Sequence, residues 1–340
     1  MSTESNNIVV PEAPAIPGLQ FRHFRGPEDY PVMVAIIDAC KVVDKIEHVD
    51  TVETLTQDYE HLINSDPRRD MLFVEVAGAP IGYSRVMWEH MPQDKQRVYQ
   101  HFAFLVPAWR GRGIWRTMLR YNERRLREIA AGHAEDAEKL FEAWAADTES
   151  AWRALLESEG YGPVRYGYEM VRPHLEDIPD LPLPAGIDVR PSSAEQFDEI
   201  IDAAREAFLD HWGFAEDEWG AEARQEWRDH RTFNPALWQV AWDGDEIAGM
   251  VLNFIDEIEN TMYHRQRGYT ETICVRRPWR KRGLARALIA RSFGVLKAAG
   301  MTEAGLGVDA QNPHGALRLY ESMGFQVTKE FVTYRKALAE

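Results

Sequence analysis

The chain repeats one order of structural elements, and this repeat constrains the fold more than any other feature of the sequence. The first half contains MLFVEVAGAPIGYSRVMW and the second contains WQVAWDGDEIAGMVLNFI, each with a turn at Gly78 or Gly244 between alternating apolar runs. Such runs on both sides of a short turn predict a β-hairpin. Each half continues with an apolar strand, a basic turn, a helix, a short strand, a helix ending in glycine and an aromatic residue, and an alternating strand. Two copies of one unit are therefore expected.

A proline-rich segment near the middle, RPHLEDIPDLPLPAGIDVR, separates the two copies. Proline density without periodicity is typical of a linker, and 340 residues are enough for two domains. We expect a flexible lead-in over residues 1–18, a first domain over 19–172, a linker over 173–186 and a second domain over 187–340. The expected class is α+β, with a mixed, mostly antiparallel twisted sheet flanked by helices in each domain.

The composition excludes several classes of function. A formal net charge of −16 argues against general binding of nucleic acid or of an anionic membrane, because the field of the protein repels phosphates. No segment approaches the ~18 apolar residues that span a bilayer, and residues 1–18 lack the pattern of a secretory signal. Cys40 and Cys274 lie far apart, without metal-ligand spacing. We therefore expect a reduced, cytoplasmic protein that holds no metal.

A basic loop lies between an expected strand and an expected helix in the second half. The residues TETICV alternate as in a strand, and apolar residues recur at helical spacing from Leu284 to the glycine at position 300. The segment 280–286 thus places positive side chains and Gly283 at a helix start. Unpaired N–H groups and the positive end of the helix dipole suit a phosphate there. The competing interpretation is a solvated basic turn, although cations at a helix start are unfavourable without an anion.

Two motifs in the second half resemble those of the GNAT acyltransferase family. Arg280-x-x-Gly283-x-Ala285 after a strand resembles the signature that binds the pyrophosphate of acetyl-CoA. A later group resembles the motif in which a tyrosine lies beside the thioester sulfur. The residues of that later group are Asn312, Pro313, Ala316, Tyr320, Gly324 and Phe325. The repeat over the whole chain resembles the tandem-GNAT architecture of the mycothiol synthase family, and this resemblance concerns the architecture and not the substrate.

The resemblance implies an acetyl-CoA-dependent N-acetyltransferase whose C-terminal domain transfers the acetyl group directly to the primary amine of a small molecule. It also implies that acetyl-CoA binds to the basic loop, to the start of the later helix and to the main chain of the preceding strand. The expected cofactor-binding residues are Ile273, Cys274, Val275, Arg280, Lys281, Arg282, Gly283, Leu284, Ala285, Arg286 and Asn312. Two other functions stay open: a non-catalytic acyl-CoA-binding or regulatory module, and the transfer of a longer acyl group.

Tyr320 and Glu271 are the expected catalytic residues. Tyr320 stands where the family has its tyrosine, which implies a general acid for the departing thiolate, although its helical spacing alone predicts a core aromatic residue. Glu271 lies on the strand before the basic loop, where family members often place a base; the alternative is a glutamate in solvent. By alternation Glu271 shares a face with Ile273 and Val275. Cys274 would then face the other side, which argues against an acyl-cysteine intermediate.

The acceptor pocket is expected in the segment EAFLDHWGFAEDEW, residues 206–219, where the family builds it between the first two helices. Asp210, His211 and Trp212 are the expected substrate-binding residues. Acidic side chains suit a cationic acceptor, and the alternative is an amphipathic helix end. Asp210, His211 and Asp309 are also weaker alternatives to Glu271 as the base.

The first half departs from the family pattern. Its loop, RGRGIW from position 110 to 115, keeps the arginine and glycine but ends in Trp115 where the second half has a small residue. The alignment places Leu156 at the position of the family tyrosine, Thr148 at the position of the asparagine and His101 opposite the strand glutamate. We expect a degenerate copy that supports the second half, with weak CoA binding as the alternative. A monomer is expected, because two halves in one chain can mimic a dimer.

Overall fold

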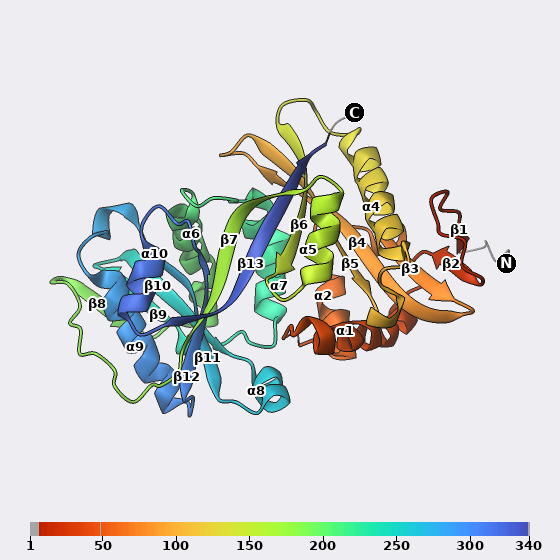
Figure 1. Ribbon diagram of the computed structural model, residues 1–340. Coiled ribbons are helices and arrows are strands. Elements are labelled where there is room, and N and C mark those ends of the chain that lie inside the picture. The colour runs from red at the N-terminus through yellow and green to blue at the C-terminus, as the bar shows by residue number, and fades with distance from the viewer. Residues whose placement is uncertain (1–6, 48, 339–340) are drawn as a thin grey trace. The chain divides into compact units, whose positions relative to one another are not determined.

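The computed structural model describes residues 7–47 and 49–338, which form two compact units. Unit 1 consists of residues up to 164, residues 215–217 and the C-terminal residues from 332 onwards. Unit 2 consists of residues 165–214 and 218–331. The α+β class is confirmed, because each unit pairs a mostly antiparallel sheet with flanking helices (Figure 1).

Unit 1 contains strands in the order β1-β2-β3-β4-β5-β6, with antiparallel pairing except between β5 and β6, which are parallel. Helices α1 and α4 pack on this sheet. The strands are β1 (Asn7–Ile8), β2 (Leu19–Arg22), β3 (Met71–Val76), β4 (Ala79–Met91), β5 (Gln96–Leu105) and β6 (Glu138–Ala146). The helices are α1 (Tyr30–Asp44), α2 (Val52–Glu60), α3 (Pro67–Asp70), α4 (Ile114–Ala130) and α5 (Ser150–Ser158).

Unit 2 repeats this plan, with strands in the order β8-β9-β10-β11-β12-β7 and parallel pairing between β11 and β12. Helices α6 and α9 pack on its sheet. The strands are β7 (Gly162–Arg172), β8 (Ile187–Arg190), β9 (Gln239–Asp243), β10 (Glu246–Ile255), β11 (Arg267–Val275), β12 (Glu303–Asp309) and β13 (Gln326–Ala337). The helices are α6 (Phe197–Phe208), α7 (Ala221–Asp229), α8 (Glu257–Tyr263), α9 (Leu284–Ala298) and α10 (Ala316–Ser322).

The last strands of the two halves do not stay with the halves in which the sequence places them. Most of β7, residues 165–172, belongs to unit 2, where it pairs with β12. The end of β13 belongs to unit 1, where Arg335 donates to the buried carboxylate of Glu142 at 2.6 Å and Lys336 donates to Glu123 at 2.7 Å. The units therefore differ in their limits from the domains 19–172 and 187–340 that the sequence suggests.

Unit 2 has a separate apolar core on each face of its sheet. On the α9 face, Ile273 and Val275 of β11 pack with buried residues of α9 and with Tyr320 of α10. On the α6 face, Cys274 of β11 packs with Leu252 and residues of α6. The expected linker 173–186 has no regular structure, and its buried Leu175 belongs to the α9-face core.

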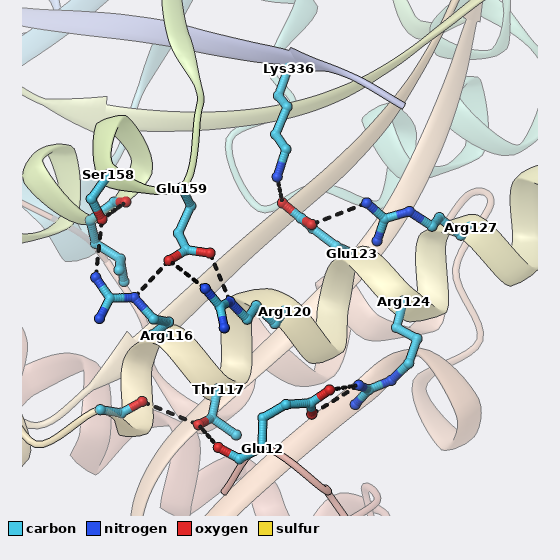
Figure 2. Close-up of polar contacts among 12 residues, drawn as sticks. Glu12, Arg116, Thr117, Arg120, Glu123, Arg124, Arg127, Ser158, Glu159 and Lys336 are labelled. Atoms are coloured by element: carbon cyan, nitrogen blue, oxygen red, sulfur yellow. Dashed lines mark hydrogen bonds and ion pairs between the residues drawn. The ribbon is translucent and has the colours of Figure 1, made fainter. Parts of the chain in front are cut away.

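Residues 12–14 pack against the first turns of α4 in unit 1 (Figure 2). Thr117 Oγ1 donates to the main-chain oxygen of Glu12 at 3.1 Å, and Arg124 Nη1 donates to both carboxylate oxygens of Glu12 at 2.7 and 2.9 Å. A β-carbon on Gly113 would lie 3.7 Å from Pro14 Cβ. Of the expected flexible lead-in, these residues are held on unit 1, and residues 1–6 lie outside the described part of the chain.

Two tryptophans fill the space between α4, α5 and the sheet of unit 1. The rings of Trp115 and Trp152 stack, with centroids 5.1 Å apart and an interplanar angle of 24°. Trp115 Nε1 donates to the main-chain oxygen of Ala103 on β5 at 3.0 Å, and both tryptophans are buried. Glu159, just after α5, accepts hydrogen bonds from Arg116 and Arg120 of α4, which fixes the two helices together (Figure 2).

Over the described residues, no helix combines the length and the apolar composition needed to cross a membrane.

We predict that Trp115→Ala lowers the free energy of unfolding of unit 1 by about 3–5 kcal/mol, because it opens a cavity and leaves the Ala103 oxygen without its donor. Urea unfolding followed by circular dichroism measures the loss. Trp144→Ala is the matched control, since Trp144 is 39% exposed on β6. An equal effect of the two substitutions would contradict the packing role of Trp115.

Candidate active site

A cavity of about 820 Å³ lies within unit 2 where β11 and β12 separate. The parallel pairing of these strands ends at Tyr269 and Gly305, whereas β10 stays paired with β11 up to Val275. The walls come from the end of α6, from η4 (Glu216–Trp219), α7, β11 and β12, and from the starts of α9 and α10. The separation leaves one edge of β11 facing the cavity, so its main-chain groups are accessible to a ligand.

An irregularity in β11 changes which side chains share a face. Thr272 has φ +47°, and the register moves so that Glu271 pairs with Leu252 and Cys274 pairs with Met250. Residues opposite each other in antiparallel strands point to the same face. Glu271 therefore shares the α6 face with Cys274, and the expectation that it shares a face with Ile273 and Val275 is wrong. Period-2 alternation fails here because a β-bulge inserts one extra residue.

Glu271 bridges the separated strands. Its Oε1 accepts a hydrogen bond from the main-chain N–H of Gly307 on β12 at 2.8 Å. Burial raises the pKa of Glu271 to about 7; the bond from Gly307 opposes this rise, and the charge of Glu169 adds to it. Near neutral pH this carboxyl is therefore divided between its acid and its base form, as a proton acceptor at neutral pH requires.

Tyr320 of α10 lines the same cavity and is 7% exposed. Burial raises the pKa of its phenol well above the ordinary value, and the negative charge of Glu271 adds to this rise. Burial likewise raises the pKa of the Cys274 thiol to about 12. Both groups are therefore protonated at neutral pH. Cys274 is a poor nucleophile for that reason, and not because it faces away from Glu271.

The basic loop forms an open helix start. Gly283 is the N-cap of α9 with φ +84°, no side chain caps the helix, and no atom lies within 4 Å of the position that a β-carbon on Gly283 would take. Lys281, Ala285 and Arg286 line the cavity, whereas Arg282 does not line it and donates to the main-chain oxygen of Ala185 at 3.3 Å. The first-turn N–H groups and the cations that line the cavity can bind a phosphate group.

Arg280 fastens the loop to the protein. Its Nε donates to Val275 O at 2.9 Å, its Nη2 donates to Ala207 O at 3.2 Å, and its Nη1 contacts Asp210 at 3.4 Å. Arg277 forms a closer ion pair with Asp210, and this bond is the main cause of the lowered pKa of that carboxyl. Arg280 thus holds the strand end against α6, and it also lines the cavity.

Of the three residues expected to bind the acceptor, His211 lines the cavity. Asp210 is engaged by Arg277, and Trp212 lies against the guanidinium of Arg165, whose carbon atom Cζ is 5.1 Å from the ring centroid. Asp309 lines the cavity but forms a two-bond ion pair with Arg165, at 2.9 and 2.6 Å. Four further residues line this side of the cavity, three of them within the expected segment 206–219 and one, Trp227, beyond it. They are Phe208, Glu218, Trp219 and Trp227.

Asn312 lines the cavity, and although an asparagine followed by a proline predicts the N-cap of a helix, Asn312 does not cap α10. The helix begins at Ala316 after Gly315, and Asn312 Oδ1 accepts from the N–H of His314 at 2.8 Å. An asparagine–proline pair indicates a turn as well as a helix start, which explains the difference.

The corresponding region of unit 1 is filled by side chains. Trp115 stands where the second copy has Ala285, and the alignment that pairs Leu156 with Tyr320 pairs Trp152 with Ala316. Ala103, whose oxygen accepts from Trp115, corresponds to Ile273 on the exposed edge of β11. His101, which corresponds to Glu271, is buried against the hydroxyl of Tyr161 at 2.8 Å, and burial lowers its pKa to about 3.

The comparison with protein families matches the part of the chain that contains the cavity. Residues 197–325 match the model of the acetyltransferase (GNAT) family. No curated protein matches the chain in a sequence comparison. Within residues 7–47 and 49–338, no group of three or more His, Cys, Asp or Glu residues is placed to hold a metal ion.

Solved structures resemble the chain over nearly its whole length. A GCN5-related N-acetyltransferase from Sphaerobacter thermophilus is 26% identical with a TM-score of 0.72, covering 95% of this chain and 96% of its own. A tandem GNAT protein from the clavulanic acid biosynthesis pathway is 14% identical with a TM-score of 0.66, covering 95% and 99%. A glucosamine N-acetyltransferase region of a fungal β-N-acetylglucosaminidase is 12% identical with a TM-score of 0.67, covering 95% and 38%. The expected tandem arrangement of GNAT folds is confirmed.

We predict that the carboxyl of Glu271 titrates near pH 7, which NMR of ¹³C-labelled glutamate measures, with Glu271→Gln identifying the signal. Because the pKa is raised from 4.5 in the folded state, this group's contribution to stability is present below about pH 4.5 and is lost as the pH rises through 7. The loss is about 1–3 kcal/mol. Glu271→Gln removes this pH dependence of the stability, and Glu222→Gln, an exposed change on α7, retains it. A midpoint below pH 5 would contradict the burial.

Proposed function

We propose that the chain is an acetyl-CoA-dependent N-acetyltransferase for the primary amine of a small molecule, with its active site in unit 2. The match of residues 197–325 to the acetyltransferase (GNAT) family supports this proposal. The observation that carries the proposal is one cavity that joins an open helix start to Glu271 and Tyr320. Its volume of about 820 Å³ lies within the range of about 300–1,000 Å³ of ligand sites.

Acetyl-CoA fits this cavity as a substrate. The pyrophosphate would bind to the first-turn N–H groups of α9 beside Lys281 and Arg286. Gly283 and Ala285 leave room for the phosphates and the arm behind them. The pantetheine arm would then run along the edge of β11 that β12 leaves unpaired, where amide groups exchange hydrogen bonds with the main chain, and the thioester would lie between β11 and β12.

The acetyl transfer proceeds by direct attack. The acceptor arrives as an ammonium ion, and the ionised carboxyl of Glu271 takes one proton from it, directly or through a water molecule. The free amine nitrogen bonds to the thioester carbonyl carbon, the carbon–sulfur bond breaks, and the second nitrogen proton passes to water as the amide forms. The products are the acetylated amine and the CoA thiolate, which requires one proton.

Tyr320 supplies the proton to the thiolate. A phenol with a strongly raised pKa is a weak acid, and proton transfer to a thiolate with an ordinary pKa of about 8.5 would be uphill. The departing sulfur, however, would leave from the same cavity in which burial raises the pKa of Tyr320. Burial would therefore raise the pKa of both the Tyr320 phenol and the CoA thiol, and the free energy of proton transfer between them would come closer to zero.

We predict that one acetyl-CoA binds per chain, and that Ala285→Trp weakens this binding by about 100-fold or more, because an indole fills the space as Trp115 does in unit 1. Isothermal titration calorimetry measures both quantities. The control is Ala298→Trp, the same substitution at the exposed end of α9. Two acetyl-CoA molecules per chain, or unchanged affinity in Ala285→Trp, would overturn the placement in unit 2.

We also predict that Tyr320→Phe lowers kcat by about 10²–10⁴-fold while the affinity for acetyl-CoA stays the same, since only proton transfer is removed. Thiol release from acetyl-CoA in the presence of a panel of amines measures kcat, and Tyr121→Phe on α4 of unit 1 is the control. Thiol release by the unmodified protein excludes a non-catalytic module. If chemistry limits the rate and kcat is unchanged in Tyr320→Phe, Tyr320 is not the acid.

A further inference from the structure

The α6 face of the cavity has a wall of aromatic side chains that the transfer chemistry does not use. Phe208 at the end of α6, Trp219 of η4 and Trp227 of α7 all line the cavity. The ring centroids of Phe208 and Trp219 are 5.7 Å apart, and those of Trp219 and Trp227 are 6.3 Å apart, so the rings form a continuous surface. Each is half-buried, with one side against the α6-face core.

The position of this wall relative to Glu271 indicates which substrate it contacts. The bulge at Thr272 turns Glu271 toward the α6 face, the face that carries the three aromatic residues. The open start of α9 and Tyr320 belong to the opposite face, where acetyl-CoA would bind. An amine that gives its proton to Glu271 would therefore have the rest of its structure against the aromatic wall, and away from the CoA arm.

The charges on this side favour a cationic ligand. Glu218 lines the cavity next to Trp219, and over the described residues its carboxylate forms no ion pair. Asp309, in contrast, is neutralised by Arg165. Burial is the main cause of the lowered pKa of His211, with the positive charges of His314 and Arg280 contributing, so His211 is neutral at neutral pH and does not repel an ammonium ion.

We propose that the acceptor is an aromatic amine of the arylalkyl type, in which a short chain joins a primary amine to a flat apolar ring held by Phe208, Trp219 and Trp227. This inference rests on the proposed function, because it assigns the second substrate of that site. Stacked or edge-on aromatic contacts are favourable beyond the area they bury. A polyhydroxylated amine is disfavoured, since its hydroxyl groups would lose water against a wall that offers them few partners.

The test uses the full-length protein and three alkylamines: 2-phenylethylamine, propylamine and glucamine, which carries hydroxyl groups in place of the ring. Thiol release gives kcat/KM with acetyl-CoA, and calorimetry with saturating CoA gives the affinity of each amine without turnover. We expect kcat/KM and affinity for 2-phenylethylamine to exceed those for glucamine by about 10-fold or more.

Variants of Trp219 distinguish the loss of contact with an aromatic ring from the loss of acetyl transfer. Trp219→Ala is expected to lower kcat/KM for 2-phenylethylamine by about 10-fold and to change that for propylamine by less than about twofold, because propylamine has no ring to stack. Trp219→Phe keeps a ring, fills most of the space and is expected to retain most of the selectivity. Trp144→Ala in unit 1, at an exposed position, is the control for tryptophan loss.

The outcomes distinguish the two proposals. If glucamine is acetylated as well as or better than 2-phenylethylamine, or if Trp219→Ala lowers kcat/KM equally for all three amines, the aromatic subsite is wrong and the acetyltransferase remains. If no amine releases thiol, but 2-phenylethylamine binds in the presence of CoA and Trp219→Ala weakens that binding, the aromatic site stands and acetyl transfer is wrong. Absence of both binding and turnover for 2-phenylethylamine overturns the aromatic site.

Discussion

The separation of β11 from β12 beyond Tyr269 and Gly305 is the constraint on which the rest of the site depends. Parallel strands normally satisfy each other's main-chain groups, and here one edge is left facing a cavity. The hydrogen bond from Gly307 N–H to Glu271 crosses this gap, so the side chain that we propose as the proton acceptor also bridges the opening. The bulge at Thr272 then directs that carboxyl to the α6 face, away from the face that carries Tyr320 and the start of α9.

The two units show what that opening requires. Both have parallel strands that part at corresponding positions, with pairing that ends near Gln100 in unit 1 and at Tyr269 in unit 2. In unit 1, Trp115 and Trp152 occupy the opening, and the indole N–H of Trp115 bonds to the main-chain oxygen of Ala103. In unit 2, alanines stand at the corresponding positions and the opening remains. The difference between the units therefore depends on side-chain volume at two positions, and the sheet plan is the same.

Much of this site could be predicted from the sequence because it depends on local chemistry. The basic loop with Gly283 required a helix start, and Glu271 and Tyr320 were placed by motif spacing; the structure brings all of them to one cavity. Asp210 was expected to face a ligand and forms an ion pair with Arg277, and Arg280, which lines the cavity, also binds the main chain around α6. No local pattern reveals such long-range pairing. The expected acceptor segment 206–219 contains Phe208 and Trp219, but their contact with Trp227 was not predicted, because the three residues have no common spacing along the chain.

The sequence by itself determined the repeat, the type of each element and the small residues that keep the second cleft open, since these follow from periodicity, turn chemistry and side-chain size. Only the tertiary structure decided the exchange of β7 and the end of β13 between the units, because both strands alternate alike and either could pair with either sheet. It also decided the face of Glu271. A bulge changes the face of a side chain by adding one residue to a strand, and its position depends on the neighbouring strand.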